Sequence, residues 1–307
     1  MNVLITGATG FIGHRFAEMS SEILEQGDEI ILLTSRKIEG YKCILHKDYT
    51  FTMEDFISAG ITKVDKIVHL GHFLAETHKD DMEVLGNILS IQNTIHLVKH
   101  LPNVPDTFVY CSSMAVYGTH REELIEETSG TSPENAYALS KIMTEMFLEE
   151  WAEKNGVNLH ILRLSHVYGP GDRRRYTIPI WLQAGGNNQP IKLSAYPDMN
   201  RNCLYIDDCC RFLAKALYLE ADIILINLVS EYNATMQEIA EICKLVSNNP
   251  FPIQFLDDGT NIKLQKGLSF NNSLCRQYLG EEKYTLRSGL EREYAYYERN
   301  QSIENVK

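Results

Sequence analysis

The sequence lacks the features that direct a protein into or across a membrane. No apolar run approaches the roughly 18 residues of a membrane-spanning helix. The first residues, Met1–Ile5, enter an expected strand without the charged and apolar regions of a secretory signal. The seven cysteines are scattered without a CxxC spacing, which is typical of reduced thiols. These absences favour a cytoplasmic protein with no membrane partner.

Positive charge is also scarce. Lys and Arg number 29 against 41 Asp and Glu, which gives a formal net charge of -12 at pH 7. A nucleic acid or an anionic membrane would need a broad cationic surface, so neither is expected as a partner. The one basic run in the sequence, Arg173-Arg174-Arg175, is read equally well as a solvated loop or as an anion contact.

What the sequence does contain is a regular alternation of short apolar strands with helices. Its 307 residues have room for one large α/β unit or two modest domains. Strands are expected at Val3–Thr6, Glu29–Leu33, Cys43–Leu45, Lys66–Leu70, Thr107–Ser112 and Val157–Leu164, and helices at Phe11–Glu25, Asp81–His100 and Asn135–Lys154. Such alternation with short connections predicts a doubly wound parallel sheet.

This rhythm loosens after Gly169, where Pro and Gly become frequent. We expect residues 1–166 to form the sheet domain, with a segment near 203–229 returning to it through a strand at Asp222–Val229. A smaller α+β domain is expected from residues 167–202 and 230–307.

A glycine-rich turn connects the first strand to the first helix. Residues 6–13 read Thr-Gly-Ala-Thr-Gly-Phe-Ile-Gly, with glycines at Gly7, Gly10 and Gly13. Such glycines allow a tight turn and a close approach of the backbone to a pyrophosphate, which the helix N-terminus attracts. The turn therefore predicts a dinucleotide site.

The end of the second strand indicates which dinucleotide. An NAD site commonly has a carboxylate there, about 20 residues past the glycines, that binds the ribose hydroxyls. This chain has Thr34, Ser35 and Arg36 instead, and Arg36 could pair with a 2′-phosphate. NADP is therefore favoured, with NAD as the alternative and a solvent-facing Arg36 as the simpler interpretation.

A tyrosine and a lysine four residues apart, Tyr137 and Lys141, share one face of an expected helix. The lysine would stabilise the phenolate, so that Tyr137 could exchange a proton while a nicotinamide exchanges hydride. Alone, this spacing is explained equally well by a chance pair on a helix surface and by a catalytic pair. Ser113 strengthens it, because it lies where the fifth strand ends, at the edge of a parallel sheet that binds ligands.

Together these motifs resemble the extended short-chain dehydrogenase/reductases, in the NAD-dependent epimerase/dehydratase family of nucleotide-sugar enzymes. The resemblance covers almost the whole chain. Its other elements are His69-Leu70-Gly71, Asn87, Asn93, Leu162-Arg163, Val167-Tyr168-Gly169-Pro170-Gly171, Arg201, Tyr205-Ile206-Asp207-Asp208, Asn227, Thr235 and Leu279-Gly280.

The resemblance implies a Rossmann domain for the dinucleotide and a smaller domain for a nucleotide-diphosphate sugar. Ser113, Tyr137 and Lys141 would be catalytic, and Lys141 would also hold the nicotinamide ribose. The expected cofactor residues are Gly7, Gly10, Phe11, Ile12, Gly13, Ser35, Arg36, Asp48 (near the adenine), Leu70, Tyr137 and Lys141. The expected substrate residues are Ser113, Met114, His166 and Arg201. For Arg201 the alternative is an ion pair with Asp207 or Asp208.

Two positions depart from the family pattern. Dehydratases of the family have an Asp-Glu pair where this chain has Met114 and Ala115, which transfer no protons, so a dehydratase is not expected. His166 replaces a common asparagine that touches the substrate diphosphate, and a histidine can still donate to an anion.

Two further features bear on metals and partners. We do not expect His69, His72 and His78 to bind a metal, because no cysteine or carboxylate spacing completes a site with them. The apolar arc of the Tyr137 helix is wider than one sheet face requires. Its members are Leu139, Ile142, Met143, Met146, Phe147, Leu148 and Trp151. We expect a homodimer through this arc, or else its burial under the second domain.

Three functions remain on this evidence. The first is reduction of a keto group, most simply at C4, of a nucleotide-linked sugar by NADPH. The second is an epimerase with a retained NAD, which the same three residues would serve. The third is a regulatory protein that senses NADP without turnover.

Overall fold

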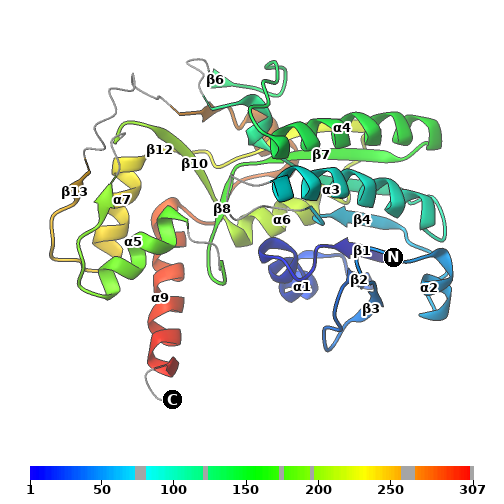
Figure 1. Cartoon of the computed structure of the whole chain (residues 1–307), viewed down its shortest axis with the longest axis horizontal. Coiled ribbons are helices and arrows are strands. Elements are labelled where there is room, and N and C mark those ends of the chain that lie inside the picture. Colours follow the sequence, from blue (N-terminus) through cyan, green and yellow to red (C-terminus); the bar gives the residue numbers. More distant parts are fainter. Residues whose placement is uncertain (73–80, 120–123, 173–175, 194–196, 257–266, 305–307) are drawn as a thin grey trace.

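A seven-stranded parallel sheet forms the centre of the molecule in the computed structural model (Figure 1), which describes residues 1–72, 81–119, 124–172, 176–193, 197–256 and 267–304. Its strand order is β11-β7-β5-β4-β1-β2-β3, and every neighbouring pair is parallel. The strands are β1 Asn2–Thr6, β2 Glu29–Thr34, β3 Lys42–Leu45, β4 Lys66–His69, β5 Thr107–Ser113, β7 Asn158–Leu164 and β11 Ile223–Leu228. The predicted doubly wound α/β fold is confirmed.

Helices cover both faces of this sheet. On one face α1 (Phe11–Ile23) packs against α6 (Ile206–Ala216), and on the other α3 (Asp81–His100) packs against α4 (Ala136–Asn155). A short helix, α2 (Met53–Ser58), lies beside β3.

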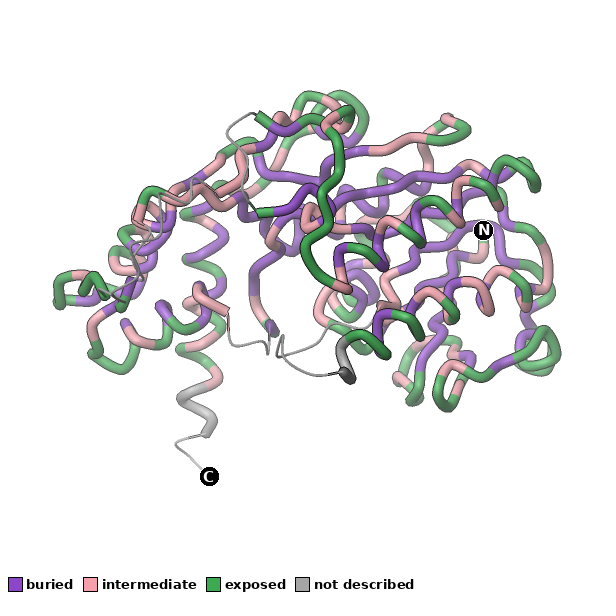
Figure 2. The backbone as a smooth tube through the Cα atoms, turned by 45° about the horizontal axis from the view of Figure 1, so that its top comes forward, coloured by how far each residue is buried: buried purple, intermediate pink, exposed green. Residues whose placement is uncertain are grey.

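Successive residues of β1 point to opposite faces of the sheet and so supply two separate cores. Val3 and Ile5 join the core with Phe16 of α1, whereas Leu4 joins the core with Leu97 of α3. In Figure 2 the central strands are buried, and exposed residues gather on the outer helices and turns.

The strand over Asp222–Val229 is β11, which pairs with β7 along its whole length. Strand β4 ends one residue earlier than expected, at His69. The N–H group of Leu70 donates to the Thr6 hydroxyl at 3.1 Å. This bond directs the chain away from the sheet toward the glycine turn.

The remaining elements lie beyond the carboxyl end of the sheet. A three-stranded sheet has the order β12-β10-β8, and α9 packs against α7 and α5. These elements are β8 His166–Tyr168, α5 Thr177–Gly186, β10 Asn200–Tyr205, β12 Asn233–Thr235, α7 Met236–Val246 and α9 Leu286–Glu304. The smaller ones are the 3-10 helix Met114–Tyr117, β6 Leu124–Ile125, β9 Lys192–Leu193, β13 Gln254–Phe255, β14 Ser269–Phe270 and α8 Ser273–Leu279.

Candidate active site

The glycine turn has the geometry that only glycine allows. Gly7 has a φ of +69°, and a Cβ on it would lie 2.8 Å from the backbone of Leu70 and of Gly71. A Cβ on Gly13 would lie 2.3 Å from the Gly7 carbonyl oxygen. Helix α1 begins after Gly10 with no side-chain cap and no acid in its first turn, so no side chain offsets its positive end.

Thr6 connects this turn to the end of β4, a role that the sequence did not indicate. Its hydroxyl accepts the N–H groups of Leu70 at 3.1 Å and Gly71 at 2.9 Å. It also bonds His69 Nδ1 at 2.7 Å. Burial lowers the pKa of His69 to about 3, so this histidine is neutral. Leu70 therefore lies directly beside Gly7, as a shared cofactor site requires.

Ser35, Arg36 and Asp48 lie together at one edge of the main sheet. Strands β2 and β3 pair up to Thr34 and Leu45, and the exposed Ser35 and Arg36 follow β2. Asp48, also exposed, has a φ of 51° in the turn after β3. Because β2 pairs with β1, Ser35 and Arg36 follow the strand next to the one that leads into the glycine turn.

Tyr137 and Lys141 meet at the first turns of α4. Asn135 caps this helix by accepting the N–H of Ala138 at 2.8 Å. Lys141 is buried, its Nζ donates to the Cys111 carbonyl at 2.7 Å, and Nζ lies 5.7 Å from the centre of the Tyr137 ring. Burial lowers the pKa of Lys141 to about 8, so most of the ammonium stays charged at pH 7.

Ser113 is the last residue of β5, the strand that carries the carbonyl bound by Lys141. Its hydroxyl accepts the N–H of Ala115 at 3.2 Å and so begins the 3-10 helix that contains Met114. Cys111 is two residues before Ser113 on the same strand. The two predicted groups, Ser113 and the Tyr137-Lys141 pair, are therefore tied to the same strand end.

Strand pairing connects His166 and Arg201 to the end of β5. Ser113 pairs with Leu164 of β7, and His166 begins β8 two residues later. His166 pairs with Cys203 of β10, and Arg201 lies two residues earlier on that strand. Both are half-buried, and the His166 ring lies 5.3 Å from the ring of Tyr176.

Other arginines hold the two carboxylates that the ion-pair alternative assigns to Arg201. Asp207 instead pairs with Arg15 at 2.7 Å, and Asp208 pairs with Arg211 at 2.5 Å.

A buried polar network holds α4 against the sheet. Glu145 of α4 receives two bonds from Arg163 of β7, at 3.1 and 2.7 Å, and one from the Ser112 hydroxyl. Arg163 also donates to the Tyr117 hydroxyl at 2.9 Å, which donates to Asn227 Oδ1 at 2.7 Å. Sequence reasoning found Arg163 and Asn227 only as parts of a resemblance and missed Glu145, which lies one turn beyond Lys141.

The described residues contain no group of three or more metal-ligating side chains. His69 and His72 bond to hydroxyl and amide groups, and His78 lies outside the described residues. In the same part of the chain, no helix is long and apolar enough to cross a membrane.

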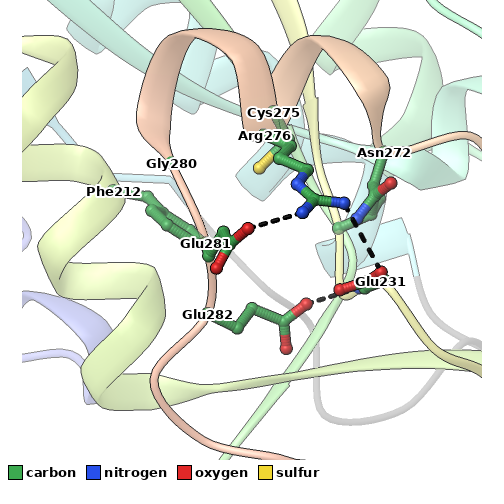
Figure 3. Close-up of a pocket in the computed structure, with 9 residues that line it drawn as sticks. Phe212, Glu231, Asn272, Cys275, Arg276, Gly280, Glu281 and Glu282 are labelled. Carbon is green, nitrogen blue, oxygen red and sulfur yellow. Dashed lines mark hydrogen bonds and ion pairs between the residues drawn. The ribbon is translucent and has the colours of Figure 1, made fainter.

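The hollow in Figure 3 is separate from these residues. It encloses about 10 Å³, room for one water molecule. Its lining residues are Phe212, Val229, Glu231, Asn272, Cys275, Arg276, Gly280, Glu281 and Glu282. Arg276 pairs there with Glu281 at 2.5 Å and Glu231 at 3.8 Å, so its charge is already balanced.

Comparison with known proteins gives sequence relatives with several activities. An uncharacterized UDP-glucose epimerase, YtcB, of Bacillus subtilis (strain 168) is 27% identical over 235 residues, covering 71% of this chain and 72% of that protein. The dTDP-4-dehydro-6-deoxyglucose reductase of Escherichia coli is 27% identical over 271 residues, covering 83% and 84%. Relatives also include dTDP-D-glucose 4,6-dehydratases, among them the one of Homo sapiens.

A solved structure shares the fold over nearly the whole chain. The UDP-glucuronic acid 4-epimerase of Bacillus cereus, in complex with UDP-glucuronic acid and NAD, superimposes with a TM-score of 0.81 at 21% identity. The match covers 98% of this chain and 100% of that one. The sequence profile of the NAD dependent epimerase/dehydratase family matches residues 3–226. This chain belongs to that family.

Proposed function

We propose that this protein is an NAD(P)-dependent oxidoreductase that reduces the 4-keto group of a nucleotide-diphosphate sugar, with Tyr137 as the proton donor. The observation that carries the proposal is the buried Lys141, held 5.7 Å from the Tyr137 ring at the same strand end as Ser113. The similarity to a dTDP-4-dehydro-6-deoxyglucose reductase over 83% of the chain supports the same reaction.

The residues present fit a dinucleotide. A Cβ on Gly7 or Gly13 would collide with the chain's own backbone, so the glycines permit the tight turn, and the uncapped end of α1 suits a pyrophosphate. When bound, the nicotinamide supplies the hydride. Lys141 lowers the cost of a phenolate on Tyr137, Ser113 orients the substrate oxygen, and Tyr137 gives that oxygen its proton. His166 and Arg201 would bind the diphosphate or nucleotide.

The cofactor proposed is NADP, with NAD as the alternative. Arg36 is exposed beyond β2, and the residues there, Thr34 and Ser35, carry no carboxylate to repel a 2′-phosphate. The solved relatives described in complex with NAD support the alternative.

An epimerase is the second candidate, favoured by the full-length structural match to a UDP-glucuronic acid 4-epimerase. A dehydratase is not proposed, because Met114 and Ala115 carry no acid or base. The NADP-sensing role without turnover has no observation in its favour beyond the fold.

A nucleotide-sugar panel tests the proposal. UDP-, dTDP-, CDP- and GDP-linked sugars are incubated with the protein and each oxidised dinucleotide, and their 4-keto derivatives with the protein and each reduced dinucleotide. Reduction predicts loss of the reduced-nicotinamide absorbance in step with alcohol formation. A new sugar isomer without net change in absorbance would assign the epimerase instead.

We further propose a homodimer through α3 and α4. These helices pack side by side and leave a row of large apolar residues at least 46% exposed. That row comprises Val84, Leu85, Ile88, Leu89, Leu139, Met143 and Met146. The alternative of burial under the second domain therefore does not hold for Leu139, Met143 or Met146, and exposed apolar residues on two packed helices suit a partner subunit.

A further inference from the structure

His72 lies between the glycine turn and Tyr137. It follows Gly71, whose N–H donates to Thr6 at 2.9 Å and whose backbone adjoins Gly7. On its other side its ring meets the Tyr137 ring edge-on, with the ring centres 5.5 Å apart. The backbone of His72 therefore directly follows the expected cofactor site, and its imidazole contacts the expected proton donor.

One ring nitrogen of His72 contacts both α3 and α4. His72 Nε2 lies 3.0 Å from the Ser140 hydroxyl of α4 and 3.3 Å from Asn87 Oδ1 of α3. Ser140 in turn lies 3.2 Å from Asn87 Oδ1 and 2.8 Å from the Tyr137 carbonyl. The backbone of Tyr137 is thus connected to His72 through a single hydroxyl.

The other nitrogen has no partner among the described residues. Burial and the nearby Lys141 lower the pKa of His72 to about 2, so the ring is neutral and carries one N–H. Because Asn87 Oδ1 is an acceptor, that proton belongs on Nε2. His72 Nδ1 is then a bare acceptor, buried and without a hydrogen bond. Buried acceptors are nearly always satisfied by protein, ordered water or a ligand, so Nδ1 can accept one donor that the described residues do not supply.

We propose that His72 is a positioning residue for Tyr137, and that its Nδ1 accepts a hydrogen bond from a hydroxyl or amide group of the bound ligand. This inference rests on the proposed function of Tyr137. The donor belongs to the dinucleotide, because His72 directly follows the residues that wall the glycine turn. A hydroxyl of the nucleotide sugar has the same chemistry and is the other source that the experiment separates.

Two substitutions separate the two nitrogens. His72→Gln places an amide near Nε2 and loses Nδ1, whereas His72→Asn places one near Nδ1 and loses the bond to Ser140 and Asn87. Titration calorimetry measures binding of NADP⁺ and NAD⁺ to each variant without sugar, and of UDP-glucose to the dinucleotide-loaded protein. His96→Gln is the control, since His96 is a half-buried histidine that bonds the Phe51 carbonyl away from the site.

His72→Gln should weaken dinucleotide binding about 5- to 10-fold, the usual effect of one lost hydrogen bond, with an unchanged melting temperature. If only the binding of UDP-glucose is weakened, the result would support the same site with the sugar as the donor. Unchanged binding of both would overturn the Nδ1 contact. These measurements need no turnover, so they stand even where wild-type protein reduces no sugar, which would reject the proposed function separately.

His72→Asn should bind the dinucleotide nearly as wild type does but lower kcat at least about 10-fold with little change in KM, because Tyr137 is displaced. A wild-type kcat would overturn the positioning role. If that chain melts early, Ser140→Ala replaces it, since it removes one Nε2 partner and keeps His72. Ser140→Ala should also lower kcat, and an unchanged kcat would overturn the positioning role of His72.

Discussion

Lys141 is the residue on which the electrostatics of the site depend. Its ammonium group faces the Tyr137 ring, and burial has lowered its pKa from the ordinary 10.5 to about 8. As pH rises through about 8, Lys141 loses its charge and with it the stabilisation of a Tyr137 phenolate.

We therefore expect kcat/KM to fall on the alkaline side with an apparent pKa of about 8. Lys141→Arg, whose guanidinium stays charged, should be slower yet lack this decline. The measurement is the pH–rate profile of both proteins. A wild-type profile that stays flat up to about pH 9.5, or the same decline in Lys141→Arg, would contradict the assignment.

Arg36 is the residue that should distinguish the two dinucleotides. Arg36→Ala should weaken NADP⁺ binding roughly 10- to 100-fold, because a charge-assisted contact with the 2′-phosphate is lost, and should leave NAD⁺ binding nearly unchanged. Fluorescence titration measures both. Lys37→Ala, which removes the neighbouring exposed cation, is the matched control. Equal losses for the two dinucleotides would reject the contact.

At the residue scale, the sequence predicted the residues whose type and spacing indicate their chemistry. It did not predict residues whose role depends on contacts between distant parts of the chain. Gly7, Tyr137 and Lys141 follow local rules of turn and helix geometry. Thr6 and Ser140 act through single hydroxyls: Thr6 accepts the N–H of Leu70, and Ser140 contacts His72, because β4 ends beside the glycine turn. No local pattern encodes such long-range hydrogen bonds.

Among the elements, α4 must be held rigidly for Tyr137 and Lys141 to meet the end of β5. Its anchor is the pair between Glu145 and Arg163, both nearly inaccessible to solvent. Each partner satisfies the other's buried charge, and removal of one leaves the other uncompensated.

Arg163→Met should accordingly lower the free energy of unfolding by about 3–5 kcal/mol, because Glu145 is left buried without its ion-pair partner. Arg287→Met, in the exposed pair with Glu291, should cost at most about 1 kcal/mol. Urea unfolding of both variants checks the difference. Losses of similar size would show that the buried pair does not anchor α4.

Elements with strong periodicity were predicted to within one or two residues, as with α1, which begins at Phe11 and ends at Ile23 rather than Glu25. The long-range strand β11 was also placed correctly, because its apolar run is short enough for a strand of a parallel sheet. Two-residue strands such as β9 and β13 carry no periodic signal, since their pairing depends on the surrounding tertiary structure.

For the whole molecule, the exposed apolar row on α3 and α4 predicts self-association. Met143→Glu should convert the proposed dimer to a monomer, since a carboxylate would be buried at its centre. Sedimentation equilibrium measures the mass. Leu245→Glu changes another exposed apolar residue, on α7, and should leave the mass unchanged. A monomeric wild type would exclude this interface.

The proposed function depends on proton transfer by Tyr137 to a sugar oxygen. The most direct measurement is single-turnover reduction of the active 4-keto nucleotide sugar by wild type and by Tyr137→Phe, with dinucleotide affinity measured on the same samples. The account predicts a loss of about 10²- to 10⁴-fold in the rate, with dinucleotide affinity retained, because only the phenol proton is removed. A Tyr137→Phe rate equal to that of wild type would contradict it.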